Sequence, residues 1–417
     1  MNVDLMKDLM NIERRKVLSV SAHSAAGTAP SLTGSLAFDH TGMYVREKGV
    51  YRYTETVPAE WMPALSSDSD DAVLYSRLRQ GALELTEALT RTTGPDLLSA
   101  EASLAATSFS RKVLFASFST DGETDQSAWV RVSLNASIRR PSGRITSGYT
   151  EKSIPVSELM SWTEDDVSAM AQSTLRDADA KDGGDVPVSS LSSGSYPAVL
   201  SSQVTCHILM QGWRIFSENR IRSGSSPLPP LGNPTGMDLG CPGITLRDVP
   251  SHPDCAFSAS LDAEGNRVPP RDLIQKGQLV HTLGKGNIGR GMTLSGSTVI
   301  QPQIIPRILY IEPGTESLED LLAEMGSGLL ITNSSDAFHS IDLSTGDYSI
   351  PCQGVWIRGR KPEFFVPGIT IAGNLLELFR RVRKTSFSLR LQEFYNHNYL
   401  YGGPDLLVES VLAGGIA

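Results

Sequence analysis

The stretch Ser195–Arg222, SYPAVLSSQVTCHILMQGWRIFSENRIR, decides how the second half of the chain is organised. It opens with the apolar run Ala198–Leu200, which is typical of a buried strand. Ser201 and Ser202 follow, and either can cap the first turn of a helix. Apolar residues then recur three and four positions apart, as on one side of a helix. The stretch therefore predicts a buried strand followed by a helix that contains His207.

A histidine on a helix after a strand raises the possibility of a zinc site. Zinc peptidases place two histidines on one helix face and a glutamate beside the first as the general base. Here Ile208 follows His207, and Gln211 and Gly212 stand four and five positions further on. The favoured interpretation is a packed or hydrogen-bonded histidine, because zinc needs three or four ligands.

Composition places the chain among ordinary globular proteins. It has 417 residues, enough for two or three domains, and is 40% hydrophobic and 20% charged. The formal charge of -9 argues against a general nucleic-acid binder, which needs an excess of Lys and Arg. A local basic patch is possible around 380–384.

The first residues, MNVDLMKDLMNIERRK, are charged throughout and lack the apolar core of a signal peptide. No stretch reaches the roughly 20 apolar residues that span a bilayer. The four cysteines, Cys206, Cys241, Cys255 and Cys352, are scattered and form no CxxC pair. We expect a cytoplasmic protein with reduced thiols and no membrane contact.

The first half of the chain predicts an α/β domain with an antiparallel sheet over residues 1–176. We expect helices over 1–18 and 70–93 and from Thr163, where Asp166 completes a capping box. The range 19–35 is predicted as a loop and 42–53 as a hairpin. Strands are predicted over 111–119, 127–140 and 144–150. The acidic, Gly/Ser-rich segment 177–194 is interpreted as an interdomain linker.

Residues 195–417 predict a strand-rich, mostly antiparallel second domain, so the fold class is α+β. The range 223–243 is rich in Pro and Gly and is predicted as a long loop. A helix is expected over 317–325, capped by Ser317 with Asp320, and another over 375–382. The predicted strands are 279–283, 304–311, 328–332, 354–358 and 369–372.

Several short motifs in this half occur in the order found in one known family. They are SYPAVLS at 195–201, SLDAEG at 260–265 followed by Val268-Pro269, LYIEPG at 309–314, STGDYS at 344–349, ITIAGN at 369–374, and GGP at 402–404 with 406–409. Together these motifs resemble the TldD/TldE (PmbA, "modulator of DNA gyrase") metallopeptidase family. The resemblance covers about half of the chain and is weaker over 100–160.

The resemblance implies a role for the position of His207. The active TldD branch carries HExxxH there, with a cysteine ligand shortly before the final Gly-Gly-Pro strand. This chain keeps His207, replaces the glutamate by Ile208 and the second histidine by Gly212, and has no cysteine over 391–401. It therefore looks like the zinc-less TldE branch, with no catalytic residue and no metal of its own.

In that family the zinc belongs to a TldD-type partner. The resemblance implies a heterodimer or higher assembly that degrades unfolded peptides or processes a natural-product precursor, with the peptide added as an extended strand in a groove. The Gly-rich loop Gly284, Gly286, Asn287 and Gly289 is expected to line that groove. The same loop matches GxGxxG, but no helical pattern follows it, so a dinucleotide site is disfavoured.

Two other classes of function stay open at this point. One is a diverged stand-alone hydrolase with a rebuilt active site. Its candidate residues are a zinc site from Cys206, His207 and His397, a Cys/His site from His339, Asp342 and Cys352, or the pair His252 and Cys255. The other is a regulatory binding protein, which the family's gyrase label suggests and the acidic charge does not support.

Overall fold

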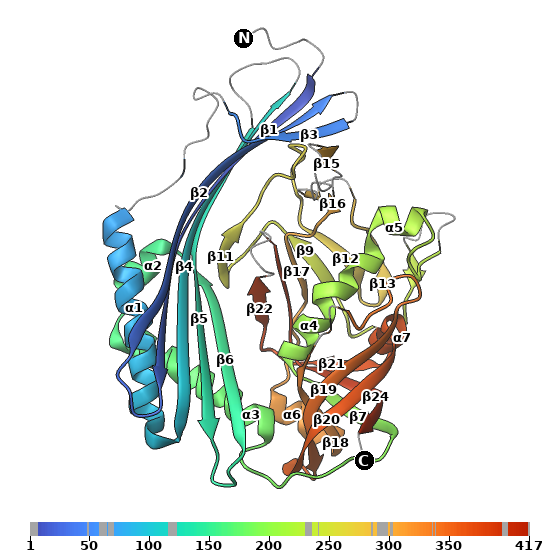
Figure 1. Cartoon of the computed structure of the whole chain (residues 1–417). Coiled ribbons are helices and arrows are strands. Elements are labelled where there is room, and N and C mark those ends of the chain that lie inside the picture. Colours follow the sequence, from blue (N-terminus) through green and yellow to red (C-terminus); the bar gives the residue numbers. More distant parts are fainter. Residues whose placement is uncertain are drawn as a thin grey trace.

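The computed structural model describes residues 7–47, 50–57, 65, 71–115, 123–229, 236–240, 242–284, 287–289, 299–300, 303–335, 337, 339–393 and 399–415. The first half is dominated by a long, curved antiparallel sheet (Figure 1). Its seven strands lie in the order β15-β3-β2-β1-β4-β5-β6. Their bounds are β1 Lys7–Ala25, β2 Ser31–Glu47, β3 Val50–Thr54, β4 Leu97–Phe115, β5 Glu123–Arg139, β6 Ile145–Ile154 and β15 Val299–Ile300.

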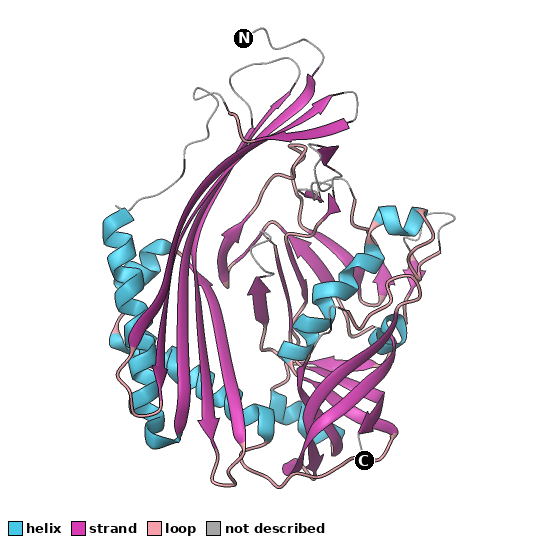
Figure 2. Ribbon diagram, in the orientation of Figure 1, coloured by secondary structure: helices cyan, strands magenta, loops and turns pink. Residues whose placement is uncertain are grey.

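Three helices cover one face of this sheet, α1 (Asp71–Thr93), α2 (Val156–Ser161) and α3 (Glu164–Asp182) (Figure 2). The short 3-10 helix η2 (Gly94–Asp96) joins α1 to β4. Leu78 and Leu85 of α1 pack with Leu104 and Leu134 of the sheet, and all four side chains are fully buried. The helices predicted over 70–93 and from Thr163 are confirmed. Thr163 and Asp166 form the expected capping box.

The helix predicted over 1–18 is wrong, because residues from Lys7 onward form strand β1. This strand pairs with β2 on one side and with β4 on the other along most of its length. Leu18, Val20 and Ala22 are buried at a period of two against the layer of helices. Backbone pairing on both sides outweighs the helical spacing of the apolar residues. The loop predicted over 19–35 is likewise mostly strand.

The predicted linker 177–194 begins inside a helix, since α3 continues to Asp182 and ends at Gly183 with φ 69°. The carboxylate Oδ2 of Asp182 accepts hydrogen bonds from Arg140 at 3.1 Å and Arg144 at 3.3 Å. Asp182, one of the acidic residues of this segment, therefore forms ion pairs with the sheet and is not part of a flexible linker.

A small barrel forms one part of the second half. Its strands lie in the order β20-β19-β18-β7-β24-β21, and a further pairing of β20 with β24 closes the ring. Helix α6 (Leu318–Met325) packs on the outside, with Ser317 and Asp320 in the predicted capping box. Helix α7 is Leu375–Arg380. The strands are β7 Gly194–Leu200, β18 Ser327–Ser334, β19 Asp347–Arg358, β20 Lys361–Asn374, β21 Val382–Thr385 and β24 Leu406–Gly415.

A second sheet of seven short strands, β22-β23-β17-β9-β12-β13-β8, completes this half and shares a hydrophobic core with the barrel. Helix α4 (Ser202–Gly212), the 3-10 helix η3 (Trp213–Phe216) and α5 (Glu218–Arg222) follow β7. The strands are β8 Met237–Asp238, β9 Leu246–Val249, β12 Arg271–Gln275, β13 Gln278–Leu279, β17 Ile308–Ile311, β22 Arg390–Glu393 and β23 Leu400–Gly403. Two small ribbons pair β10 Ser251–His252 with β11 Cys255–Ser258 and β14 Ile288–Gly289 with β16 Gln303–Ile304.

The α+β fold class is confirmed, with antiparallel pairing in the first sheet and in most of the second half. Of the pairings described, β7 with β18 and β17 with β23 are parallel. The predicted strand 279–283 is only the end of β13, and 304–311 is divided between β16 and β17. None of the helices within the described ranges is long and apolar enough to cross a membrane.

Candidate functional site

Helix α4 follows strand β7 as the sequence predicts, and its first turn is tightly held. Ala198–Leu200 are fully buried, and the Ser201 side chain caps the helix by accepting from Val204 N. Asp405, which the sequence analysis did not single out, accepts a hydrogen bond from Ser202 N at 2.7 Å. A carboxylate at a helix N-terminus stabilises the exposed amides of the first turn. The Gly-Gly-Pro-Asp segment therefore fixes where α4 begins.

The two glycines of that segment let α4 and β22 approach strand β23. A Cβ at Gly403 would lie 2.4 Å from Thr205 Cγ2 on α4. A Cβ at Gly402 would lie 2.3 Å from the carbonyl oxygen of Arg390 on β22. Any side chain at either position would force the helix or the strand away.

His207 is partly buried on α4, and its Nδ1 lies 2.8 Å from Ser334 Oγ at the end of β18. Burial lowers the pKa of His207 to about 4, and the positive charge of Arg390 contributes in the same direction. The imidazole is therefore neutral at pH 7. This agrees with the prediction of a packed, hydrogen-bonded histidine.

The positions that would complete a zinc site on α4 do not suit the metal. Ile208 is only 2% exposed and belongs to the hydrophobic core. A Cβ at Gly212 would lie 3.1 Å from Leu375 Cδ1, so a larger residue there would require that leucine to shift. Nowhere in the described ranges do three His, Cys, Asp or Glu side chains gather as metal ligands. His397 lies outside the described residues. The described donors around His207 thus do not reach the three ligands that zinc needs.

The cysteines that the structure describes are poorly suited to nucleophilic chemistry. Cys206 is fully buried, and its Sγ donates to the Arg390 carbonyl at 3.4 Å. Burial raises the pKa of Cys206 and of Cys352 to about 12 and that of Cys255 to about 11. A thiol with so high a pKa holds almost no thiolate at pH 7. Cys241 lies outside the described residues.

The proposed Cys/His combinations are not built as catalytic pairs. His339 and Asp342 are exposed, whereas Cys352 is buried, with its Sγ donating to the Ile350 carbonyl. His252 Nδ1 accepts from Asp254 N at 3.1 Å. Burial lowers the pKa of His252. The His252 ring therefore stabilises the turn at 253–254 by this hydrogen bond.

A cluster of charged residues that the sequence analysis missed lies where α4 and β22 face the first sheet. We call it the central polar cluster; it comprises Arg131, Tyr149, Glu151, Asp177, Lys181, His207, Arg390 and Glu393. Arg390 reaches across to the first half and donates to Asp177 Oδ1 at 3.4 Å and to the Tyr149 carbonyl at 3.3 Å. Asp177 also accepts from Tyr149 N at 2.7 Å and pairs with Lys181 at 2.7 Å.

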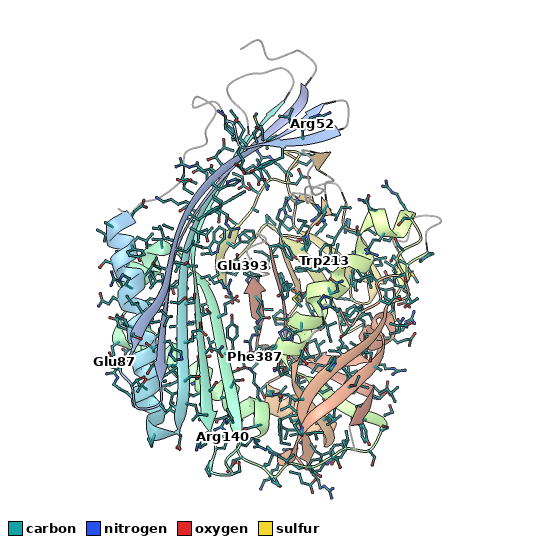
Figure 3. The ribbon with its side chains drawn as sticks, viewed as in Figure 1. Arg52, Glu87, Arg140, Trp213, Phe387 and Glu393 are labelled. Carbon is teal, nitrogen blue, oxygen red and sulfur yellow. The ribbon has the colours of Figure 1, made fainter. Side chains whose placement is uncertain are left out.

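The other side of the cluster is centred on Glu151 of β6. Its carboxylate accepts from Arg131 Nε at 3.1 Å, from the Tyr149 hydroxyl and from Glu393 N at 3.1 Å. Burial raises the pKa of Glu393, whose carboxylate accepts from Trp129 Nε1 at 3.3 Å. In Figure 3, Glu393 lies between the first sheet and α4. Some of these contacts are local, such as Asp177 with Lys181, but Arg390 and Glu393 meet the others only through tertiary structure, so no local motif predicts the cluster.

The predicted groove loop is only partly described. Gly284 is buried, and a Cβ there would lie 2.3 Å from the Glu218 carboxyl carbon. Asn287 is fully buried, and its Nδ2 donates to Asp248 Oδ2 at 2.6 Å. Gly289 is the second residue of the short strand β14, and the residues that follow it, 290–298, lie outside the described residues. Gly286 lies outside the described residues.

The SLDAEG turn at 260–265 joins the two halves of the molecule. Asp262 is fully buried and accepts hydrogen bonds from Glu264 N and Asn266 N, both at 2.9 Å. The carbonyl of Leu261 accepts from Arg111 of β4 at 2.6 Å and from Arg307 at 3.4 Å. The motif is therefore a docking turn for the first sheet.

Solved structures share this two-part arrangement. A protein described as a modulator of DNA gyrase from Thermotoga maritima superposes with a TM-score of 0.73 at 17% identity, over 97% of this chain and 96% of its own. TldE from Thermococcus kodakarensis superposes with a TM-score of 0.73 at 14% identity, over 98% and 97%. These likenesses define the class of fold: a helix-covered antiparallel sheet joined to a strand-rich second half of the TldE type.

Sequence comparison then gives the family. The model for the PmbA/TldA metallopeptidase C-terminal domain matches residues 193–415, and the chain belongs to this family. The metalloprotease PmbA of Escherichia coli O157:H7 is 29% identical over 143 residues, which is 33% of this chain and 30% of that protein. A PmbA homologue of Haemophilus influenzae is 29% identical over 133 residues, or 30% and 27%. The matches thus span about a third of the curated relatives.

Proposed function

We propose that this chain is the non-catalytic, TldE-like subunit of a heteromeric zinc metallopeptidase, whose zinc is held by a TldD-type partner. The observation that carries the proposal is the geometry at α4. The helix occupies the family's place after β7, yet Ile208 is a core residue and Gly212 packs against Leu375. His207 is neutral and held by Ser334.

The chain keeps the structural parts of the family site while lacking its chemistry. Asp405, Gly402 and Gly403 still fix α4 and β22 in place. Such a subunit completes a chamber and a peptide groove and leaves water activation to the partner. We further propose a cytoplasmic assembly acting on unfolded peptides or on a natural-product precursor peptide.

A stand-alone hydrolase gains no support from the described residues. Cys206 and Cys352, whose thiol pKa values are raised, are buried, and His207 has no carboxylate neighbour on its helix to act as a base. No observation favours a regulator of a topoisomerase over the subunit role.

The test measures bound zinc and peptide cleavage for the chain alone and after co-expression with a TldD-type partner carrying HExxxH. We expect no zinc and no cleavage with the chain alone, and zinc with cleavage in the complex. The matched control is His207→Ala in this chain, which should leave zinc content of the complex unchanged. Stoichiometric zinc on the chain alone, lost in His207→Ala, would overturn the proposal.

A further inference from the structure

Helix α4 carries buried polar groups that have no hydrogen-bond partner in the part of the chain that the structure describes. Gln203 and Gln211 are 8% and 7% exposed, and the Oε1 atom of each lacks a hydrogen bond. Gln203 uses the other end of its amide to donate to Asn333 at 3.0 Å. Buried polar atoms are almost always hydrogen-bonded, because an unpaired one retains its full desolvation cost. Two such atoms on one short helix therefore require an explanation.

The two glutamines share one face of α4 with His207. Positions 203, 207 and 211 are four residues apart, so their side chains stack along the same side of a helix. His207 and the adjacent Met210 are partly exposed. Thr205 lies on the opposite side, with its Cγ2 against Gly403, and its Oγ1 also lacks a partner.

The spacing of this face matches an extended peptide. Residues four apart on a helix are separated by about 6 Å along its axis. In an extended chain the amides on one edge recur every second residue, at about 6.6 Å. Three successive amides on one edge of a peptide therefore have nearly the same spacing as Gln203, His207 and Gln211.

The chemistry of the face also suits peptide amides. Each unpartnered Oε1 is an acceptor, and a backbone N–H is a donor. His207 has Nδ1 engaged by Ser334, and its ring is neutral at pH 7. Phe387 is 63% exposed and follows Ser386, whose hydroxyl donates to the Asp405 carboxylate that holds the start of α4.

We propose that the face of α4 formed by Gln203, His207 and Gln211 binds the backbone of an extended peptide. This inference rests on the proposed function, in which a peptide is the ligand of the assembly. It assigns part of the binding to this subunit. On binding, both glutamine amides rotate outward beside His207, and their Oε1 atoms accept from the first and third of three successive N–H groups on one edge of the peptide.

The test measures fluorescence anisotropy of a fluorescein-labelled, N-acetylated Ala–Ser repeat peptide with the full chain and no partner. Gln211→Met keeps the length of the side chain and removes the unpaired acceptor. We expect its peptide Kd to rise about five- to tenfold, the size of one lost hydrogen bond. We also expect its melting temperature to rise, because a buried unsatisfied atom is gone.

The matched control is Thr205→Val, which removes an equally unpaired oxygen from the opposite side of the helix. It should also raise the melting temperature but leave the Kd unchanged. No peptide binding by the chain, an unchanged Kd in Gln211→Met, or a lowered melting temperature in that variant would each overturn the proposal.

The result is separable from the test of the subunit role. If co-expression yields no zinc-bearing complex but Gln211→Met weakens peptide binding as expected, the proposed function is wrong and peptide binding by α4 is still supported. If the complex cleaves peptides with the same KM in Gln211→Met as in the native sequence, the peptide face is overturned and the subunit role stands.

Discussion

The first sheet meets the second half of the chain at two arginines that are held very differently. Arg111 is 7% exposed at its side chain, donates to both the Leu261 carbonyl and Glu13, and contacts Glu13 through two nitrogens at 2.8 and 3.0 Å. Arg390 is 20% exposed and makes longer contacts of 3.3 and 3.4 Å. Arg111 is thus buried, held inside the first sheet by two hydrogen bonds to Glu13 Oε1 and joined to the second half by its bond to Leu261, whereas Arg390 makes a looser contact beside α4.

We infer from this difference that the contacts of Arg111 and Arg390 have different roles. The buried Arg111 guanidinium holds the Leu261 carbonyl of the second half against the first sheet. A looser contact beside α4 lets the central polar cluster adjust without disturbing that position. The contrast leads to four predictions, from the largest expected effect to the smallest.

Arg111→Met should be the most damaging substitution. It leaves the largely buried Glu13 carboxylate without the Arg111 cation, and loss of one partner of a buried pair costs about 3–5 kcal/mol of unfolding free energy. Chemical denaturation measures the change. The control, Arg267→Met, breaks an exposed pair with Glu123 and should cost less than about 0.5 kcal/mol. Equal losses in both variants would remove the contrast between buried and exposed pairs.

His207 should make stability depend on pH. Its pKa is lowered to about 4 in the folded chain, against about 6.5 when unfolded, so the unfolded state binds the proton first. The contribution is fully present above pH 6.5 and is lost as the pH falls toward 4, by about 3 kcal/mol. Buried carboxyls titrate in the same range, so the quantity to compare is the difference between the native sequence and His207→Gln. Identical pH profiles would contradict the burial of this ring.

Gly402→Ala tests whether the close approach of β22 is required. The new Cβ would meet the Arg390 carbonyl oxygen, and we expect a loss of about 1–3 kcal/mol, as for other overpacked sites. Gly368→Ala is the matched control, since a Cβ there has no neighbour within 4 Å. Thermal unfolding of both variants gives the comparison. A tolerated Gly402→Ala would mean that β22 shifts freely.

Arg390→Met should have the smallest effect on stability, about 1 kcal/mol, because the pairs that it breaks are partly exposed. It should also raise the pKa of His207, because the nearby positive charge helps to lower it. An NMR titration of the His207 ring measures that shift. A loss as large as that of Arg111→Met would show that both contacts are anchors.

Local sequence was sufficient wherever the structure is decided within a few residues. The capping boxes at Thr163 with Asp166 and at Ser317 with Asp320 form as predicted, since each depends on residues three positions apart. The strand and cap before α4 and the unsuitable residues Ile208 and Gly212 were likewise readable from the sequence. Strand β1 was not, because its pairing with β2 and β4 decides its conformation.

The central polar cluster could not be predicted from sequence patterns, because its contacts also join residues far apart in the chain. Arg390 meets residues 213 and 241 positions away in the chain. No periodicity or motif links such positions, and each residue alone resembles an ordinary surface charge. The buried glutamines of α4 were hidden in a different way, since polarity in a helix normally indicates an exposed face.

The closure of the barrel has a consequence for biosynthesis. Strand β24 pairs with β7, β20 and β21, and its Leu406 lies opposite Leu200 of β7. During translation β7 cannot pair with β24 until the chain between them, residues 201–405, has been synthesised. Until then β7 and β20 expose open edges, which are prone to misassociation. The barrel therefore closes only after β24 has been synthesised, and growth temperature and chaperone supply should affect the yield of native protein.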